Sequence, residues 1–143
     1  MYFVRKLIRF FLNTKPTKTA HSFLDKKGRK IWYFWDGDPI NDFFIYHRGR
    51  LAGRMQIIYK GDVLELGDIV IFERYQQYRN SGIGTMMFIL LADFAREHNF
   101  IKIEGWMQPE SIDEWPKLLK FYHSLGCEIN GKYFVYWVEK HSI

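Results

Sequence analysis

The chain has 143 residues, 48% of them hydrophobic and 19% aromatic, which is typical of one folded domain and excludes disorder over most of its length. The net charge is +5, but nine of the 21 Lys and Arg residues lie within residues 1–30, where Asp25 is the single acid. Proteins that read nucleic acid usually spread basic residues over a folded face, so this one-sided charge argues against that class. One cysteine, Cys127, excludes an intrachain disulfide and is consistent with a reducing cytoplasm.

The N-terminal residues 1–29 are expected to form a basic amphipathic helix followed by a linker. Between residues 3 and 13, apolar side chains cover one broad helical face and basic side chains share the opposite arc. Such a helix can lie at a membrane surface, or it can pack on the protein's own core or on a partner. The same basic residues interrupt any secretory signal, and no stretch approaches the ~18–20 apolar residues of a membrane span. Residues 13–30 predict a linker or long loop.

Four aromatic or β-branched runs follow, separated by short turns rich in Gly, Asp and Pro. Short connections of this kind predict an antiparallel meander. The predicted strands are residues 30–35, 42–47, 51–59 and 63–72.

The pattern changes at Gly82. Residues 83–98 are almost continuously apolar and predict a helix that is buried on more than one side. Residues 100–106 alternate apolar and charged side chains, as a strand does. A strand, a helix and a strand form a crossover unit, so the strands over 63–72 and 100–106 should be parallel.

The C-terminal part predicts a second helix and a final hairpin. The helix covers residues 116–124 and stops at Gly126. Residues 127–129 and 132–139 form the hairpin, because Asn130-Gly131 between them is the strongest two-residue hairpin signal.

Residues 79–85, with the sequence Arg-Asn-Ser-Gly-Ile-Gly-Thr, are the most informative stretch. Two glycines separated by one residue let backbone N–H groups converge where the helix begins. The N–H groups of a first helical turn lack intrahelical partners and, with the helix dipole, bind an anion such as a diphosphate. Arg79 can add a charge-assisted contact to phosphate. The stretch lacks the Lys-Ser/Thr ending of a P-loop and the third glycine of a dinucleotide fingerprint. A turn that only starts the helix is the alternative.

In this context the sequence resembles a known family. Arg79-x-x-Gly82-x-Gly84 looks like the acetyl-CoA signature of the GNAT acetyltransferase superfamily, R/Q-x-x-G-x-G/A. The heptapeptide Phe121-Tyr122-His123-Ser124-Leu125-Gly126-Cys127 is similar to the family's F/L-Y-x-x-L-G-F element. The resemblance covers roughly residues 30–140, and the predicted domain is 30–143. It implies an α/β (α+β) GNAT-like fold: a mixed, mostly antiparallel sheet with a central βαβ acetyl-CoA-binding unit and a C-terminal hairpin.

The resemblance also implies a function and a set of site residues. The implied activity is an acetyl-CoA-dependent N-acetyltransferase that moves an acetyl group to an amine by direct attack in a ternary complex, with acetyl-CoA as co-substrate. The implied catalytic residues are Tyr122, which would protonate the departing thiolate, and Glu73, which would accept the amine proton; Glu104 and Asp68 are other candidates for that base. The implied cofactor-binding residues are Phe72, Glu73, Arg74, Arg79, Asn80, Ser81, Gly82, Ile83, Gly84 and Thr85.

Two positions depart from the family pattern. Trp115 stands seven residues before Tyr122, where the family often has Asn, and Cys127 replaces an aromatic residue. A core tyrosine is the alternative for Tyr122, and solvated strand residues are the alternative for the candidate carboxylates. A non-catalytic acyl-CoA-binding or interaction module on the same fold is therefore the alternative function. The five histidines show no metal-binding spacing, so no metal is expected.

The expected partner is a small-molecule or peptide amine, whose identity the sequence leaves open. No nucleic acid is expected. Residues 1–13 can contact a membrane surface or another protein, and the aromatic last strand can bury itself in a homodimer. We expect a cytoplasmic protein that its N-terminal helix can bring to the membrane surface.

Overall fold

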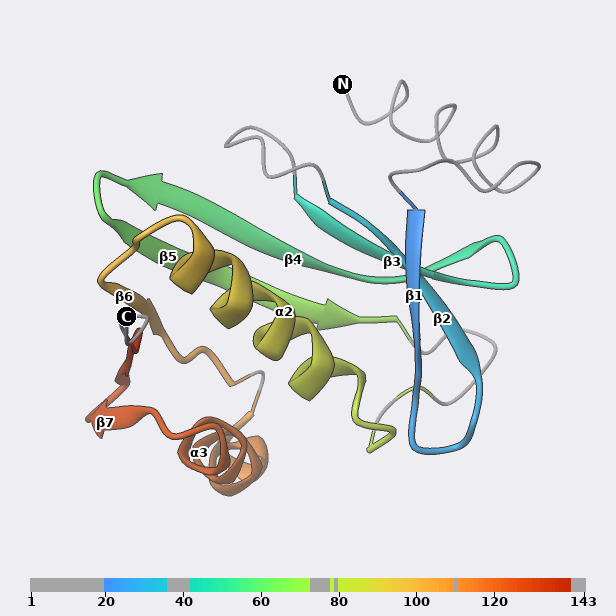
Figure 1. Cartoon of the computed structure of the whole chain (residues 1–143). Coiled ribbons are helices and arrows are strands. Elements are labelled where there is room, and N and C mark those ends of the chain that lie inside the picture. The colour runs from blue at the N-terminus through green and yellow to red at the C-terminus, as the bar shows by residue number, and fades with distance from the viewer. Residues whose placement is uncertain (1–19, 36–41, 73–77, 79, 110, 140–143) are drawn as a thin grey trace. The chain divides into compact units, whose positions relative to one another are not determined.

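The computed structural model describes residues 20–35, 42–72, 78, 80–109 and 111–139 (Figure 1). These residues form one sheet with the strand order β1-β2-β3-β4-β5-β6-β8-β7, two α-helices and a short 3-10 helix. The elements are β1 (Ala20–Leu24), β2 (Lys30–Phe34), β3 (Phe43–His47), β4 (Arg50–Lys60), β5 (Val63–Ile71), α2 (Ile83–Glu97), β6 (Lys102–Trp106), η1 (Ile112–Glu114), α3 (Trp115–Ser124), β7 (Glu128–Asn130) and β8 (Tyr133–Trp137).

The chain divides into two compact units. The first unit contains the residues up to Met55 together with Ile69–Ile83, and the second contains Gln56–Asp68 and the residues from Gly84 onward. The boundary passes through β4 and β5, so each of these strands contributes to both units.

In the first unit, β1, β2 and β3 pair antiparallel with their neighbours and β3 pairs antiparallel with β4. All five residues of β3 are buried, because aromatic side chains cover it: the Tyr33 ring stacks on Phe43 with centroids 5.3 Å apart, and His21 stacks on Tyr33 at 5.5 Å. The meander of the three strands over residues 30–59 is confirmed.

Strand β1 corrects one sequence-based expectation. Residues 13–30 predict a linker, but Ala20–Leu24 form a strand that pairs with β2 in the register Ala20↔Phe34 to Leu24↔Lys30 (Figure 1). The segment Ala-His-Ser-Phe-Leu does not alternate apolar and polar residues, and both Leu24 and His21 are exposed. Cross-strand pairing with the aromatic β2 stabilises it instead.

In the second unit, β5 and β6 are parallel, as the predicted crossover requires, with the register Val63↔Lys102 to Glu65↔Glu104. β6 and β7 pair antiparallel with β8. Helix α2 is buried through Met87, Phe88 and Leu91, and the Phe88 ring meets Tyr136 edge-on at 5.4 Å. The predicted helix over 83–98 is confirmed to within one residue at its end.

The ends of α3 and of the last hairpin follow local rules. Gly126 adopts φ +87°, its N–H donates to the His123 carbonyl (3.0 Å), and the Cys127 N–H donates to the Tyr122 carbonyl (3.1 Å). This is the Schellman arrangement, which needs a left-handed residue that glycine supplies. The final hairpin is confirmed, but Asn130 pairs with Tyr133, so its turn consists of Gly131 and Lys132, one residue later than predicted.

Candidate functional site

The glycine stretch lies immediately before helix α2. Asn80 and Gly82 have φ of +57° and +82°, so the backbone turns sharply twice before the helix starts at Ile83. Ser81 is fully buried, and its hydroxyl donates to the Tyr78 carbonyl, which fixes the start of the stretch. No residue that the structure describes accepts a hydrogen bond from the N–H of Gly82, Ile83 or Gly84. The first turn of α2 therefore keeps its anion-binding donors.

The turn between β1 and β2 packs against this stretch. The Lys26 N–H donates to the Ser81 carbonyl at 2.8 Å. The aliphatic part of the Lys26 side chain lies beside Gly82, since a Cβ at that glycine would stand 3.2 Å from Lys26 Cγ. The positive φ favours glycine at position 82, and a Cβ there would also press on the Lys26 side chain.

A buried ion pair holds the shape of this turn. Asp25 accepts hydrogen bonds at Oδ1 from the Lys27 N–H (3.0 Å) and the Arg29 N–H (2.8 Å), and at Oδ2 from Arg29 Nε (2.7 Å). Burial alone would raise the pKa of the Asp25 carboxyl, but the hydrogen bonds and the charge of Arg29 outweigh it and lower that pKa. Asp25 is therefore ionised at neutral pH, with its charge compensated by Arg29.

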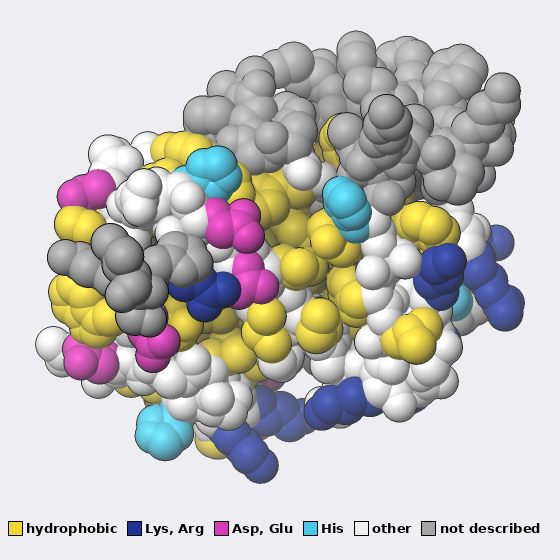
Figure 2. Space-filling view, viewed as in Figure 1, with side chains coloured by type: hydrophobic (Ala, Val, Ile, Leu, Met, Phe, Trp, Pro, Cys, Tyr) yellow, Lys and Arg dark blue, Asp and Glu magenta, His cyan; other side chains and the backbone are white. Residues whose placement is uncertain are grey.

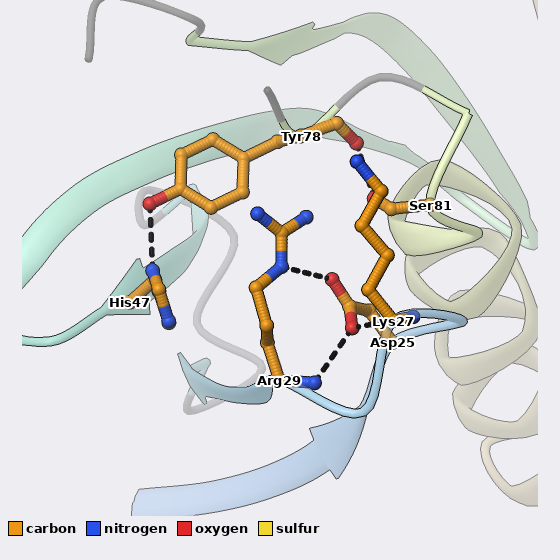
Figure 3. Close-up of polar contacts among 6 residues, drawn as sticks. All are labelled: Asp25, Lys27, Arg29, His47, Tyr78 and Ser81. Atoms are coloured by element: carbon orange, nitrogen blue, oxygen red, sulfur yellow. Dashed lines mark hydrogen bonds and ion pairs between the residues drawn. The ribbon is translucent and has the colours of Figure 1, made fainter. Parts of the chain in front are cut away.

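Arg29 connects the turn to a second polar pair (Figure 3). Its guanidinium lies over the Tyr78 ring, 4.8 Å from the centroid, and the Tyr78 hydroxyl lies 2.7 Å from His47 Nδ1. Burial, together with the charges of Arg29 and Arg48, lowers the pKa of His47, although Asp25 opposes the shift. His47 is therefore neutral at pH 7, and the pair braces the residue that precedes the glycine stretch.

In the second unit, strands β5 and β6 separate partway along their length. Their ladder ends at Glu65 and Glu104, although β5 continues to Ile71 and β6 to Trp106. The backbone of β5 after Glu65 thus has no ladder partner on its β6 side among the described residues. Gly105, just past the end of the ladder, still lies close to β5, since a Cβ there would come within 2.6 Å of the Leu66 carbonyl.

Tyr122 is buried in the same unit on α3. Its ring stacks on Phe134 at 4.0 Å and meets Phe88 edge-on at 6.5 Å. Burial, together with the charges of Cys127 and Asp68, raises the pKa of the Tyr122 hydroxyl well above its usual range. No described residue forms a hydrogen bond with that hydroxyl. The phenol is therefore protonated and able to donate.

The carboxylates differ in their availability as a base. Glu104 accepts hydrogen bonds from the Tyr133 hydroxyl and from Lys102 Nζ (3.0 Å), and these contacts lower its pKa despite its burial. Both contacts are made by Oε2 and favour the ionised form, so Glu104 is a weaker proton acceptor than an uncontacted carboxylate. Asp68 lies on β5 and is exposed. Glu73 lies outside the described residues.

The remaining predicted site residues have mixed positions. Ile83 and Ser81 are buried, Gly84 and Thr85 are half-buried in the first turn of α2, and Asn80 is exposed. The Phe72 N–H donates to the Ala52 carbonyl (2.8 Å), so this amide is not free for a ligand. Arg74 and Arg79, like Glu73, lie outside the described residues.

Sequence reasoning missed the contribution of the β1–β2 turn. A usable signal was present, because Asp25-Lys26-Lys27-Gly28 has Asp at the first and Gly at the fourth position of a β-turn. The structure forms that turn, with the Gly28 N–H donating to the Asp25 carbonyl (3.0 Å) and Gly28 at φ +76°. The contact between this turn and Ser81 has no local sequence signal.

Neither a metal cluster nor a membrane-spanning helix is found in the described part of the chain. Within it, no group of three or more His, Cys, Asp and Glu side chains is arranged to hold a metal ion. None of its helices is both long and apolar enough to cross a membrane.

Comparison with solved structures defines the class of fold. The ribosomal-protein-S18-alanine N-acetyltransferase from Escherichia coli is similar to 97% of this chain over 91% of its own, with a TM-score of 0.62 and 12% identity. Nourseothricin acetyltransferase is similar over 89% of this chain and 92% of its own, with a TM-score of 0.55 and 16% identity. The PaiA N-acetyltransferase from Thermoplasma acidophilum, in complex with coenzyme A, is similar over 66% of this chain (TM-score 0.52, 12% identity), which spans 57% of its length.

These similarities show a mixed α+β fold of the acetyltransferase type. The chain has the fold of the GNAT N-acetyltransferases, and the fold class and the resemblance inferred from the sequence are confirmed at that level. No protein-family model and no curated protein sequence matches the chain.

Proposed function

We propose that this protein is an acetyl-CoA-dependent N-acetyltransferase. The observation that carries the proposal is the glycine stretch at the start of α2, where the N–H groups of Gly82, Ile83 and Gly84 have no acceptor among the described residues. Helix N-termini of this kind bind phosphate groups. The GNAT fold, and the complex of the PaiA enzyme with coenzyme A, support the same proposal.

The donor set fits coenzyme A on chemical grounds. Backbone amides at a helix N-terminus suit a diphosphate. The open side of β5 after Glu65 offers backbone groups to the amides of a pantetheine arm. Alternate residues of a strand direct their backbone groups to opposite sides. The Phe72 N–H is bonded to β4, so the backbone groups of the preceding residue, Ile71, point to the open side of β5. When bound, acetyl-CoA would supply the activated acyl group.

In the proposed reaction an amine nitrogen attacks the thioester carbonyl carbon, a C–N bond forms and the C–S bond breaks. The amine gives up one proton to a base, for which Glu73 is the candidate from the sequence. The leaving sulfur takes one from the Tyr122 hydroxyl, and the proton held by the base returns to Tyr122 through solvent. The raised pKa of that hydroxyl weakens it as an acid in water. Burial also raises the pKa of a thiol. It raises the pKa of Cys127, for example, to about 12. A thiolate that forms in equally dry surroundings would take the proton readily.

A charge-reversal series tests the phosphate site. Gly84 has a helical backbone, and a Cβ there would touch only the Phe121 ring at 3.5 Å, an ordinary contact. Gly84→Glu places a carboxylate in the first turn of α2, where it favours the helix but repels a diphosphate. Gly84→Gln is the neutral control of equal size. We expect titration calorimetry to give at least about tenfold weaker coenzyme A binding for Glu than for Gln, or about 1.4 kcal/mol. Equal affinities of the two variants, or no binding by the unaltered protein, would reject the proposed site.

A second candidate function is an acyl-CoA-binding module without catalysis. It is favoured because Tyr133 and Lys102 both contact the Glu104 carboxylate. These contacts lower the pKa of Glu104, which makes it a poorer base. The release of coenzyme A from acetyl-CoA in the presence of a panel of small amines and peptide N-termini separates the candidates. Binding without release for every amine would select the module.

For partners and location we propose a small-molecule or peptide amine as acceptor and the cytoplasm as compartment. The basic amphipathic pattern of residues 1–13 supports a peripheral contact with an anionic membrane. Sedimentation with anionic liposomes, compared between the full chain and a chain with its basic residues in this segment changed to Gln, tests that contact. Self-association through the aromatic last strand is a further proposal that analytical ultracentrifugation checks.

A further inference from the structure

The β1–β2 turn carries two lysines whose charges have no partner among the described residues. Lys26 and Lys27 are exposed, and neither forms an ion pair or hydrogen bond through its side chain with a described residue. The neighbouring cations differ: Arg29 is bound to Asp25, and Lys30 Nζ lies over the Trp32 ring at 4.5 Å. The uncompensated positive charge of the turn thus belongs to Lys26 and Lys27.

The turn lies directly against the glycine stretch. The Lys26 N–H is bonded to the Ser81 carbonyl at 2.8 Å, and its side chain runs along Gly82. In Figure 3 the Lys27 side chain extends from the turn toward the segment that carries Tyr78 and Ser81. The Lys26 side chain therefore lies beside Gly82, and Lys27 is the next residue of the same turn.

The arrangement of the acids allows an anion to approach. Asp25 is the acid nearest in the chain, but its carboxylate is buried and its three hydrogen bonds direct it at Arg29 and the turn's own backbone. A buried, compensated carboxylate repels an anion far less than a free one. Asp25 thus holds the turn together, and Lys26 and Lys27 are the exposed charges of that turn.

We propose that Lys26 and Lys27 bind the phosphate groups of the acyl-CoA, as a cationic clamp beside the glycine stretch. This inference rests on the proposed function and extends it to an element that precedes the resemblance to the GNAT family. The N-terminal excess of positive charge then has a local role at this turn, through two of its nine basic residues. A lysine contributes a compact charge that can follow a phosphate through several positions.

The experiment replaces each lysine by methionine, because methionine keeps most of the aliphatic length that covers Gly82 and removes the charge. Lys132→Met is the matched control, since Lys132 is also exposed in a hairpin turn. Titration calorimetry with coenzyme A, 3′-dephospho-coenzyme A and pantetheine provides the readout for every variant, and thermal unfolding verifies that each is folded.

We expect the double variant Lys26→Met/Lys27→Met to bind coenzyme A at least about tenfold more weakly than the unaltered protein, with smaller losses for the single variants and none for Lys132→Met. The loss should shrink at high salt, because screening weakens exposed charge contacts. A loss that persists with dephospho-coenzyme A assigns the lysines to the diphosphate, and a loss that disappears assigns them to the 3′-phosphate; either supports the clamp.

Three results overturn the inference, and they are distinguishable. If the unaltered protein binds coenzyme A and the folded double variant binds it equally well, the clamp is wrong while the proposed function stands. If pantetheine binding falls as much as coenzyme A binding, the lysines act on the fold and not on phosphate. If the unaltered protein binds no coenzyme A, the proposed function fails first and the clamp fails with it.

Discussion

Removal of the Asp25 carboxylate should destabilise the protein measurably. Asp25→Ala deletes the acceptor of two backbone hydrogen bonds and one ion-paired hydrogen bond. A hydrogen bond to a charged group contributes about 1.5–3 kcal/mol and an ordinary one about 0.5–1.5 kcal/mol, and the exposed Lys27 N–H can recover water. The Arg29 charge remains half-buried without its partner. We therefore expect a loss of about 3 kcal/mol in the free energy of unfolding.

Asp25→Asn separates the two contributions. Both backbone N–H groups donate to Oδ1, which the amide of Asn retains, whereas Arg29 Nε donates to Oδ2, where Asn places an NH₂ group. Asn should therefore lose only the ion-pair part, about 1.5–2 kcal/mol. Urea unfolding followed by circular dichroism measures both variants, and Asp113→Ala, at an exposed acid in η1, is the control with an expected change within about 0.5 kcal/mol.

The pH dependence has a definite sign. The pKa of Asp25 is lower in the folded protein than its ordinary value of 3.8, so its stabilisation is complete above that value and is lost as the pH falls through the folded pKa. The difference between the unaltered protein and Asp25→Ala should be constant from pH 5 to 7 and shrink below about pH 4. A loss under 1 kcal/mol for Asp25→Ala at pH 7, or a difference that grows on acidification, would refute the assigned ion pair.

Three further variants or reactions test other parts of the structure. Tyr122→Phe should lower turnover at least about tenfold and change stability by less than about 1 kcal/mol, because the ring keeps its stacking on Phe134 and the hydroxyl has no described partner; unchanged turnover would contradict the acid role. Gly126→Ala should lower the free energy of unfolding in urea by about 1–2 kcal/mol. Open space surrounds the new methyl group, so only the φ of +87° is unfavourable, and an unchanged unfolding midpoint would argue against this left-handed conformation. Burial raises the pKa of Cys127 to about 12, so the folded protein at pH 8 should react with iodoacetamide at least about a hundredfold more slowly than the unfolded chain, as mass spectrometry can follow; equal rates would place the thiol at the surface.

Much of the fold was accessible from the sequence because its signals are local. The apolar run after Gly82 has the length of a buried helix, and the strand on each side of it identifies a parallel crossover. The Leu125-Gly126 ending of α3 appears as a glycine stop, and the structure supplies its reason in the left-handed φ. These features depend on residues within a few positions of one another.

The part of the site that could not be predicted depends on contacts between distant segments. His47 and Tyr78 are 31 residues apart and each is unremarkable in its own strand or loop. The same holds for Lys26 and Ser81, which meet through backbone groups and leave no trace in side-chain pattern. Pairing of β1 with an aromatic neighbour likewise overrides a weak strand propensity in that segment.

Exposed apolar side chains have a bearing on handling of the protein. Trp106, Trp137 and Ile112 are among the large hydrophobic residues that remain more than half exposed, and Figure 2 shows hydrophobic side chains interspersed with charged ones over the visible surface. Scattered exposure of this kind is common in folded proteins. The measurements of binding and unfolding should therefore be repeated at several protein concentrations.

The opening between β5 and β6 has an evolutionary consequence. A gap bordered by main-chain N–H and C=O groups depends on the path of the strands and is nearly indifferent to which side chains the strands carry. Mutation can therefore replace most of the surrounding residues while the opening persists, so long as positions with no room for a Cβ, such as Gly105 beside the Leu66 carbonyl, stay unchanged. Such an opening can outlast the recognisable ancestry of the sequence that forms it, in keeping with a shared fold at 12% identity.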